Sequence, residues 1–210
     1  MQPIDKTTPT KQKILVCAVD LFVSKGYTET SIREIAAAVG IKPASLYNHF
    51  SSKEDILLYI LDDYSKYTET MFSTKDLVPC LEQNPTAEGI SACIMSSVSR
   101  LVKNDYYSKI FFLIHQEQHH IESFRDHVLE RYRVTMNYIN KVFDVLKTLN
   151  IISEDINSNN YWTVIIFSML YTISNHGAFN KKTNAENNNE MDNADLFRYI
   201  FDVIIKYKPS

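Results

Sequence analysis

Residues 26–53 read GYTETSIREIAAAVGIKPASLYNHFSSK, and this stretch decides the fold of the 210-residue chain. Apolar side chains recur at helical spacing over residues 32–39, which predicts a first helix with one buried face. Gly40 offers the left-handed backbone that ends a helix, and Pro43 suits the first turn of a second helix. A helix, a tight turn and a short second helix form the layout of a helix-turn-helix DNA reader.

The side chains of the second helix divide between an inward and an outward face. Leu46 and Phe50 lie four residues apart and are expected to point into a core. The outward set combines donors with one aromatic ring, which suits phosphates and base edges better than a hydrophobic core. The residues expected to read bases are Lys42, Pro43, Ala44, Ser45 and Asn48.

Phosphate contacts are expected from three places in the motif. The end of the second helix carries the phenol of Tyr47 and the imidazole of His49. The start of the first helix carries two hydroxyls and a guanidinium, and the helix that follows begins with the ammonium of Lys53. Each of these groups can donate to a phosphate oxygen. The expected phosphate donors are Tyr47, His49, Thr30, Ser31, Arg33 and Lys53.

Three of these residues have simpler interpretations when taken alone. Tyr47 can be a half-buried core aromatic, and Ser31 can be a helix cap completed by Glu34. Arg33 can be a solvated surface residue. The order and spacing of the whole set favour the DNA interpretation.

Leu-Tyr-Asn-His-Phe at residues 46–50 follows Ile-Ala-Ala-Ala-Val-Gly-Ile at residues 35–41. With the amphipathic helix that precedes it, this segment resembles the DNA-binding domain of the TetR family of bacterial transcriptional regulators, over roughly residues 10–65. The resemblance implies a homodimer with a three-helix reading head on each subunit and a ligand-sensing helical domain behind it. It also implies a palindromic operator, and in the family the positions of Tyr47 and His49 commonly contact phosphates.

The charge distribution agrees with this interpretation. The whole chain has a formal net charge of -3, but residues 1–53 hold seven Lys and Arg against four Asp and Glu. The remaining residues hold 15 basic and 21 acidic side chains, so the anion-binding surface is expected near the N-terminus. An excess of three positive charges is modest, and binding should depend strongly on salt.

Three cysteines without paired spacing, Cys17, Cys80 and Cys93, predict neither a disulfide framework nor a zinc site. The first ten residues are polar, and the apolar run at residues 161–173 is too short to span a bilayer. The chain is therefore expected to work in the cytoplasm, without a cofactor or a resident metal. The sequence has no Gly-rich phosphate loop and no nucleophile elbow, so an enzyme is not expected.

The fold is expected to be all-α, because the chain has only four Gly and six Pro and shows helical spacing almost throughout. A flexible segment is expected at residues 1–9, the DNA-binding domain at 10–53, and an effector-binding and dimerisation domain at 54–210. Pro79 and Pro85 mark a break. The expected helices are 9–25, 32–39, a short helix that starts near Lys42 and Pro43, 52–72, 86–103, 105–117, 120–149, 158–175 and 192–207.

The last two of these helices are expected to pair with those of a second subunit, as the family resemblance implies. Some of their apolar residues must belong to the intrachain core instead, and the sequence does not divide them. The apolar residues concerned are Trp162, Ile165, Ile166, Met169, Leu170, Leu196, Ile200, Val203 and Ile204.

Aromatic and Met residues at helical spacing can line a pocket for a small apolar or aromatic effector, although each taken singly is more often ordinary core. Two alternatives stay open: a metal-sensing regulator that uses the cluster His115, His119 and His120, or a regulator whose C-terminal domain binds a protein. The expected pocket residues are Tyr64, Tyr67, Phe111, Phe112, His115, Met136, Phe143, Trp162, Ile166 and Met169.

Overall fold

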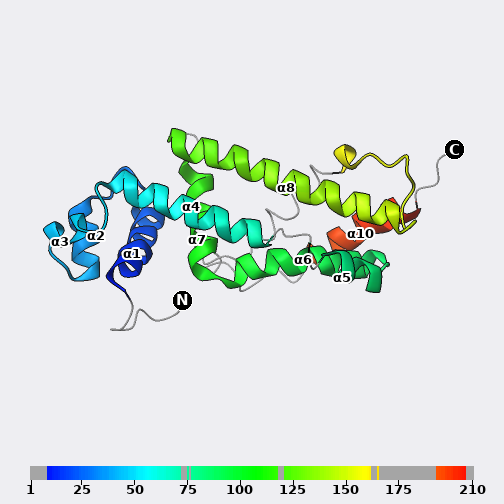
Figure 1. Cartoon of the computed structure of the whole chain (residues 1–210), viewed down its shortest axis with the longest axis horizontal. Helices are drawn as coiled ribbons and strands as arrows, with labels where there is room; N and C mark the ends of the chain where they lie inside the picture. The colour runs from blue at the N-terminus through cyan, green and yellow to red at the C-terminus, as the bar shows by residue number, and fades with distance from the viewer. Residues whose placement is uncertain are drawn as a thin grey trace, which may run out of the picture. The chain divides into compact units, whose positions relative to one another are not determined.

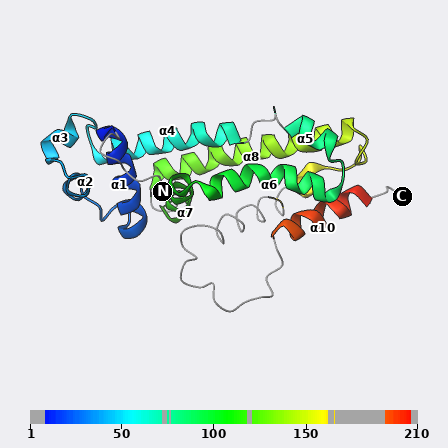
Figure 2. The same ribbon diagram turned by 90° about the horizontal axis from the view of Figure 1, so that it is seen from below.

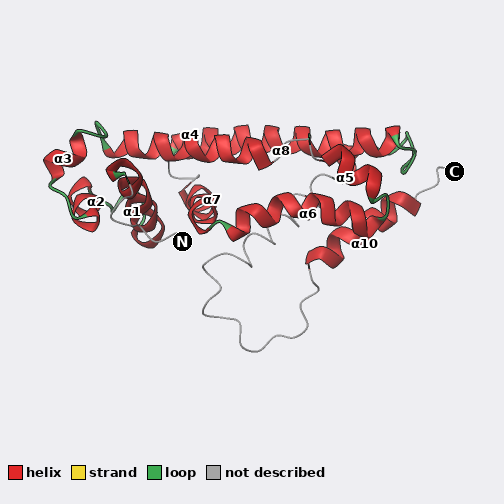
Figure 3. Cartoon of the chain, turned by 60° about the horizontal axis from the view of Figure 1, so that its bottom comes forward, coloured by secondary structure: helices red, strands yellow, loops and turns green. Residues whose placement is uncertain are grey.

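The computed structural model describes residues 9–71, 75, 77–117, 121–161, 165 and 193–206. Within these residues every regular element is a helix and none is a strand, so the all-α prediction is confirmed (Figures 1 and 3). The elements are α1 (Thr10–Lys25), α2 (Ile32–Val39), α3 (Pro43–Tyr47), α4 (Lys53–Met71), α5 (Leu77–Gln83), α6 (Ala87–Lys103), α7 (Asp105–Glu117), α8 (Glu122–Thr148), the 3-10 turn η1 (Ser158–Asn160) and α10 (Asn193–Lys206).

The chain divides into two compact units. The first contains Met1–Thr68 and Asn104–Glu130, and the second contains Glu69–Lys103 and Arg131–Ser210. The first unit therefore includes more than the expected DNA-binding domain, because most of α4, all of α7 and the start of α8 pack with it. The functional boundary after residue 53 stays a prediction.

A small apolar core holds the N-terminal helices of the first unit together. α1 packs against α2 and α7, and α2 packs against α3. Ile14, Ala18 and Phe22 of α1 are fully buried, as expected, whereas Leu21 is only half-buried. α4 follows with four buried residues at helical spacing, Ile56, Leu57, Ile60 and Leu61.

In the second unit, α6 packs against both α5 and α10 (Figure 2). The sequence prediction missed α5, since Pro79 was expected to break the chain. Pro79 is the third residue of α5, where a backbone N–H has no partner within the helix. A proline is therefore tolerated there.

Soon after the end of α8, the backbone of one residue adopts the left-handed conformation. Asn150 has φ 55°, and the N–H of Ile151 donates to the carbonyl of Leu146 at 2.9 Å. This pair of features is the Schellman arrangement with Asn in place of Gly. The expected helix over residues 158–175 falls mostly outside the described residues, which include the 3-10 turn η1 at its start.

α10 is amphipathic in the structure. Ile200, Phe201 and Ile204 are buried within the second unit, whereas Tyr199 and Val203 are 66% and 45% exposed. Ile200 and Ile204 thus belong to the intrachain core. The structure separates these residues from the exposed face, which the sequence pattern alone did not.

Candidate nucleic-acid interface

A left-handed glycine makes the turn between α2 and α3. Gly40 has φ 79° and ψ 31°, and its N–H donates to the carbonyl of Ala37 at 3.1 Å. The N–H of Ile41 donates to the carbonyl of Ala36 at 2.9 Å, which completes a Schellman turn. The predicted role of Gly40 is therefore confirmed.

Two buried side chains fix α3 on the rest of the unit. Leu46 is fully buried and Phe50 is 3% exposed, as expected. The ring of Phe50 meets the edge of Tyr59 at 5.8 Å between centroids, and the ammonium of Lys11 lies 3.9 Å from the centroid of the Tyr59 ring. These contacts hold the short helix by its inner side and leave its outer side to the solvent.

The outer side of α3 and its two ends form a continuous exposed set, which we call the α3 surface. All its members are exposed, and Tyr47 has 55% of its surface accessible. The interpretation of Tyr47 as a half-buried core residue is therefore wrong. The α3 surface consists of Lys42, Pro43, Ala44, Ser45, Tyr47, Asn48 and His49.

α2 begins with a capping box. The Oγ of Ser31 accepts the N–H of Glu34 at 3.3 Å, and the Glu34 carboxylate accepts the N–H of Ser31 at 2.8 Å. The simpler interpretation of Ser31 as a helix cap is therefore confirmed, and its hydroxyl also donates to Glu34 at 2.8 Å. Arg33, two residues further along the chain, is exposed to solvent.

The Glu34 carboxylate has a low proton affinity. Hydrogen bonds from the ammonium of Lys25 and from the side chain and backbone of Ser31 lower the pKa of Glu34 from 4.5 to about 2. The carboxylate pairs with Lys25, so this cation is partly neutralised within the protein. The exposed Lys and Arg side chains of residues 25–53 that do not pair with Glu34 in this way are Arg33 and Lys42.

Thr30 does not belong to the exposed set. Only 1% of its surface is accessible, and its hydroxyl donates to the carbonyl of Gly26 at 2.8 Å. The prediction that Thr30 offers its hydroxyl to DNA is a mistake that follows from its place in the sequence next to Ser31. Alternation along this extended segment turns one hydroxyl inward and leaves the other outside.

Lys53 also differs from its predicted role. Its Nζ donates to the backbone carbonyls of Tyr27, Thr28 and Thr30 at 2.7, 3.2 and 2.8 Å. An ammonium has three protons, so these three bonds use its full donor capacity. Lys53 ties the segment before α2 to the start of α4, and it is not placed as a free phosphate clamp.

The segment before α2 is held from a second side by a residue that the sequence analysis did not select. The carboxylate of Glu117, at the end of α7, accepts the N–H of Tyr27 at 3.1 Å. The ring of Tyr27 packs edge-on against Phe22 and Phe124. No local spacing signals this contact, because 90 residues separate the two partners.

The expected pocket residues of the first unit are packed against one another or against neighbours. Tyr64 and Phe111 are buried, and Tyr67 stacks on Tyr107 with ring centroids 3.7 Å apart. The Nδ1–H of His115 donates to the carbonyl of Phe111 at 2.9 Å, and Phe112 meets the edge of the Phe111 ring.

In the second unit, Phe143 is buried between Tyr161 and Phe201, and Met136 is half-buried. Trp162, Ile166 and Met169 lie outside the described residues, as do His119 and His120. Among the residues that the structure describes, no three His, Cys, Asp or Glu side chains gather as they do around a metal ion. The described helices also contain none that is long and apolar enough to cross a membrane.

Comparison with protein families identifies the N-terminal part of the chain. Residues 14–60 match the family described as bacterial regulatory proteins, tetR family. The matched residues run from α1 to the middle of α4, so they contain the whole α3 surface together with Leu46 and Phe50.

Two curated relatives share this region. The chain is 36% identical over 111 residues to the HTH-type transcriptional repressor KstR2 of Rhodococcus jostii, covering 47% of this chain and 54% of that protein. It is 37% identical over 82 residues to the biofilm operon icaADBC regulator IcaR of Staphylococcus aureus, covering 39% and 40%. The matches thus span about half the length of these relatives or less, and both relatives are regulators of transcription by name.

Solved structures match the fold of almost the whole chain. Salmonella enterica GusR superposes with a TM-score of 0.66 at 18% identity, covering 97% of this chain and 99% of that one. The fatty acid degradation regulator FadR of Bacillus halodurans gives a TM-score of 0.64 at 14% identity, covering 96% and 97%. The N-terminal head thus matches the TetR family of bacterial transcriptional regulators in sequence, and almost the whole chain matches solved structures in fold.

Proposed function

We propose that this protein is a cytoplasmic, homodimeric, ligand-responsive repressor that binds a palindromic operator through the α3 surface. The exposure of that surface supports the proposal most directly. Seven of the eight residues from Lys42 to His49 are exposed, while Leu46 and Phe50 are buried and anchor the helix. A short helix held in this way can enter a major groove without losing its own core.

Within the α3 surface, Tyr47 and His49 are proposed to donate to phosphates, joined by Arg33 from α2. Ser31 is left out, because its one hydroxyl proton is donated to Glu34. Lys42 is the one cation of this surface that can reach a guanine, and Pro43 and Ala44 can contact thymine methyl groups. Thr30 and Lys53 are left out of the proposed interface. With few base contacts, part of the specificity is expected to come from the shape of the DNA.

A homodimer is proposed because one three-helix head reaches only one half-site. The exposed side of α10, with Tyr199 and Val203, is the described part of the proposed contact. The other expected helix, over residues 158–175, lies mostly outside the described residues.

The effector is proposed to be a small apolar molecule. Buried aromatic residues are abundant in both units, among them Tyr64, Phe111 and Phe143. One structure of the same fold, FadR of Bacillus subtilis, was solved in complex with stearoyl-CoA, at 18% identity and a TM-score of 0.57 over 93% of this chain and 97% of that one. Long-chain acyl-CoA esters are therefore a sensible first set of probes beside aromatic compounds.

The proposal is tested by footprinting the purified protein on the DNA that flanks its own gene. Wild type is expected to protect a palindrome, and Tyr47→Ala and His49→Ala should each weaken binding by about 1.5–3 kcal/mol for every charged hydrogen bond lost. The wild-type affinity should fall steeply with salt, and Tyr47→Ala, which removes no charge, should bind more weakly at every salt concentration with the same slope.

A matched control is Tyr132→Ala. Tyr132 on α8 is 42% exposed, which makes it a surface tyrosine comparable to Tyr47 outside the α3 surface. The Tyr132→Ala variant should bind DNA with the affinity of the wild type. Equal binding by Tyr47→Ala and wild type would show that α3 is not the reading helix.

A further inference from the structure

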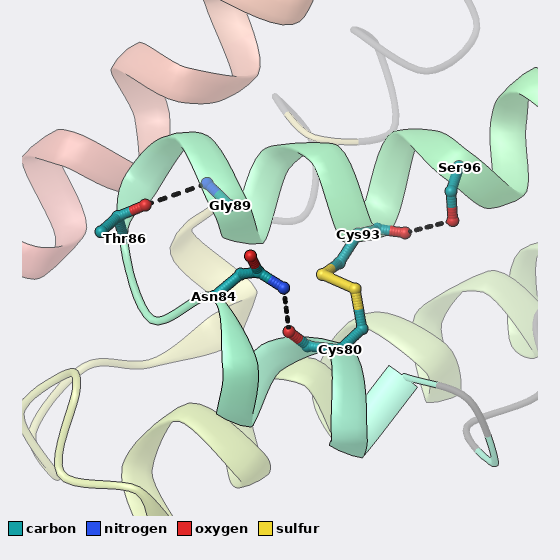
Figure 4. The surroundings of a disulfide bond; sticks show 6 residues. All are labelled: Cys80, Asn84, Thr86, Gly89, Cys93 and Ser96. Carbon is teal, nitrogen blue, oxygen red and sulfur yellow. Dashed lines mark hydrogen bonds between the residues drawn. A yellow bond between two sulfur atoms is a disulfide. The ribbon is translucent and has the colours of Figure 1, made fainter.

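The second unit contains a cysteine pair that the sequence analysis did not anticipate. Cys80 of α5 and Cys93 of α6 form a disulfide bond, with Cα atoms 6.0 Å apart (Figure 4). The expectation of no disulfide is therefore wrong. Cys80 and Cys93 are 13 residues apart, a spacing that matches no cysteine motif. The packing of α5 on α6 brings the two side chains together.

Contacts other than the bond also bring the two helices close together at this corner. Gly89 in the first turn of α6 lies so close to the end of α5 that an added Cβ would stand 2.5 Å from the Cβ of Asn84, the residue that follows α5. The side-chain amide of Asn84 donates to the carbonyl of Cys80 at 3.0 Å, and the hydroxyl of Thr86 accepts the N–H of Gly89 at 3.1 Å (Figure 4). Leu81 is fully buried, so α5 is also fixed by its apolar side.

The two sulfurs differ in their surroundings. Cys93 is buried, with 5% of its surface accessible, whereas Cys80 is half-buried. A reagent from solution therefore reaches Cys80 before Cys93. The third cysteine, Cys17, lies in the other unit, and burial together with Asp20 raises the pKa of its thiol.

We propose that Cys80 and Cys93 are a reversible thiol–disulfide site that peroxide closes and a cellular dithiol opens. The assignment rests on the proposed function in one respect, since a DNA-bound regulator works in the cytoplasm, where disulfides are usually transient and redox-sensing. Close packing of α5 on α6 at Gly89 would keep the two cysteines near each other in the reduced protein, so the pair could respond without refolding.

The chemistry balances with a peroxide as the oxidant. The Cys80 thiolate attacks one peroxide oxygen, so that an S–O bond forms, the O–O bond breaks, and water or an alcohol leaves after taking up a proton. Cys93 then attacks the sulfur of the resulting sulfenic acid, the S–O bond breaks, and hydroxide leaves as water with the Cys93 proton. Two thiols have lost two electrons and the peroxide has gained them.

The reverse step uses thiol exchange. A thiolate of an external dithiol attacks the more accessible Cys80 sulfur, and Cys93 leaves and takes up a proton. The second thiol of the reagent then releases Cys80, and the external dithiol is oxidised. The redox state of the pair decides whether α5 and α6 are joined covalently.

α6 also contacts the end of α4. Arg100, two helical turns after Cys93, donates to the carbonyl of Met71 at the end of α4, at 3.1 Å. The helix that carries Cys93 thus also holds the last residue of α4.

The first experiment counts thiols in the purified, fully reduced chain before and after a stoichiometric amount of hydrogen peroxide. Two of the three thiols should be lost, and mass spectrometry of peptides should place the new bond between Cys80 and Cys93. In Cys17→Ser both remaining thiols should be lost. Persistence of all three thiols in wild type, or bonding between subunits only, would overturn the proposal.

The order of attack is tested with single cysteine variants and dimedone, which traps sulfenic acids. Cys93→Ser should be labelled at Cys80 after peroxide, and Cys80→Ser should be labelled far less at Cys93. Gly89→Ala, which pushes the corner apart, should slow bond formation by about tenfold or more. Equal labelling and an unchanged rate would contradict the roles assigned to the two sulfurs.

Reversibility is tested on the folded, oxidised protein with thioredoxin or millimolar glutathione. The bond should open without denaturant. A bond that opens only when the protein is unfolded would be a permanent cross-link, and the proposal would fail. None of these measurements uses DNA, so a failure to find an operator would leave their result intact and would count against the DNA-binding proposal alone.

Discussion

At the scale of single residues, Lys53 shows how a basic side chain next to a DNA reader can have an internal task. Its ammonium holds three carbonyls of the segment before α2, and the ring of Tyr27 lies 4.4 Å from it. Burial lowers the pKa of Lys53, which is consistent with an ammonium withdrawn from water.

Lys53→Met should therefore lower the free energy of unfolding by about 1–3 kcal/mol, because three carbonyls lose a charged donor. The measurement is urea unfolding followed by circular dichroism. Lys66→Met is the matched control, because Lys66 forms only an exposed pair with Asp62 and should change stability by less than about 0.5 kcal/mol. Equal midpoints for the two variants would show that the three bonds contribute no net stability.

The low pKa of Glu34 predicts how its contribution to stability changes at acidic pH. Its pKa in the folded protein is about 2, below the ordinary value of 4.5. The stabilising effect of its ionised form is therefore present above pH 4.5 and is lost as the pH falls through about 2.

An NMR titration of the Glu34 carboxyl carbon should show a midpoint near the lower value. Ser31→Ala removes one of the hydrogen bonds and should move the midpoint upward. A wild-type midpoint close to 4.5 would mean that the Lys25 and Ser31 bonds do not persist in solution.

At the scale of elements, the α5–α6 corner combines a close approach at Gly89 with a covalent bond. Closing a loop of this length removes conformations from the unfolded chain, so the disulfide should stabilise the protein by about 3 kcal/mol. Reduction of the wild type should lower its free energy of unfolding by about that amount, measured by urea unfolding with and without dithiothreitol. The double variant Cys80→Ser, Cys93→Ser should not respond to the reductant; a response of equal size there would trace the effect to something other than this bond.

At the scale of the whole molecule, α10 carries the prediction about assembly. Tyr199 and Val203 lie one turn apart on its exposed side, opposite the buried Ile200 and Ile204. Val203→Arg should place a charge in the proposed subunit contact and convert the dimer into a monomer, and operator binding should weaken with it.

Light scattering after size-exclusion chromatography measures the change directly. Leu58→Glu is the control, because Leu58 is a similarly exposed apolar residue, 49% accessible, on α4. It should leave the molar mass unchanged. A Val203→Arg protein that keeps the wild-type mass would place the subunit contact elsewhere.

The sequence by itself determined the local structure of the reading head. The bounds of α1, α2 and α4, the left-handed Gly40, the cap at Ser31 and the inward Leu46 and Phe50 all follow from patterns that span at most a few turns. Such features depend on neighbouring residues and on backbone preferences, which the order of amino acids specifies directly. The all-α class and the exposed α3 surface follow from the same local rules.

Only the tertiary structure decided which polar side chains of the head face inward and which distant residues meet. Thr30 is buried and Lys53 is occupied by carbonyls, although both carry groups that suit a phosphate. The contact between Glu117 and Tyr27 and the bond between Cys80 and Cys93 join residues on different helices. These outcomes depend on how helices pack, and packing involves residues far apart along the chain, so no local pattern in the sequence contains them.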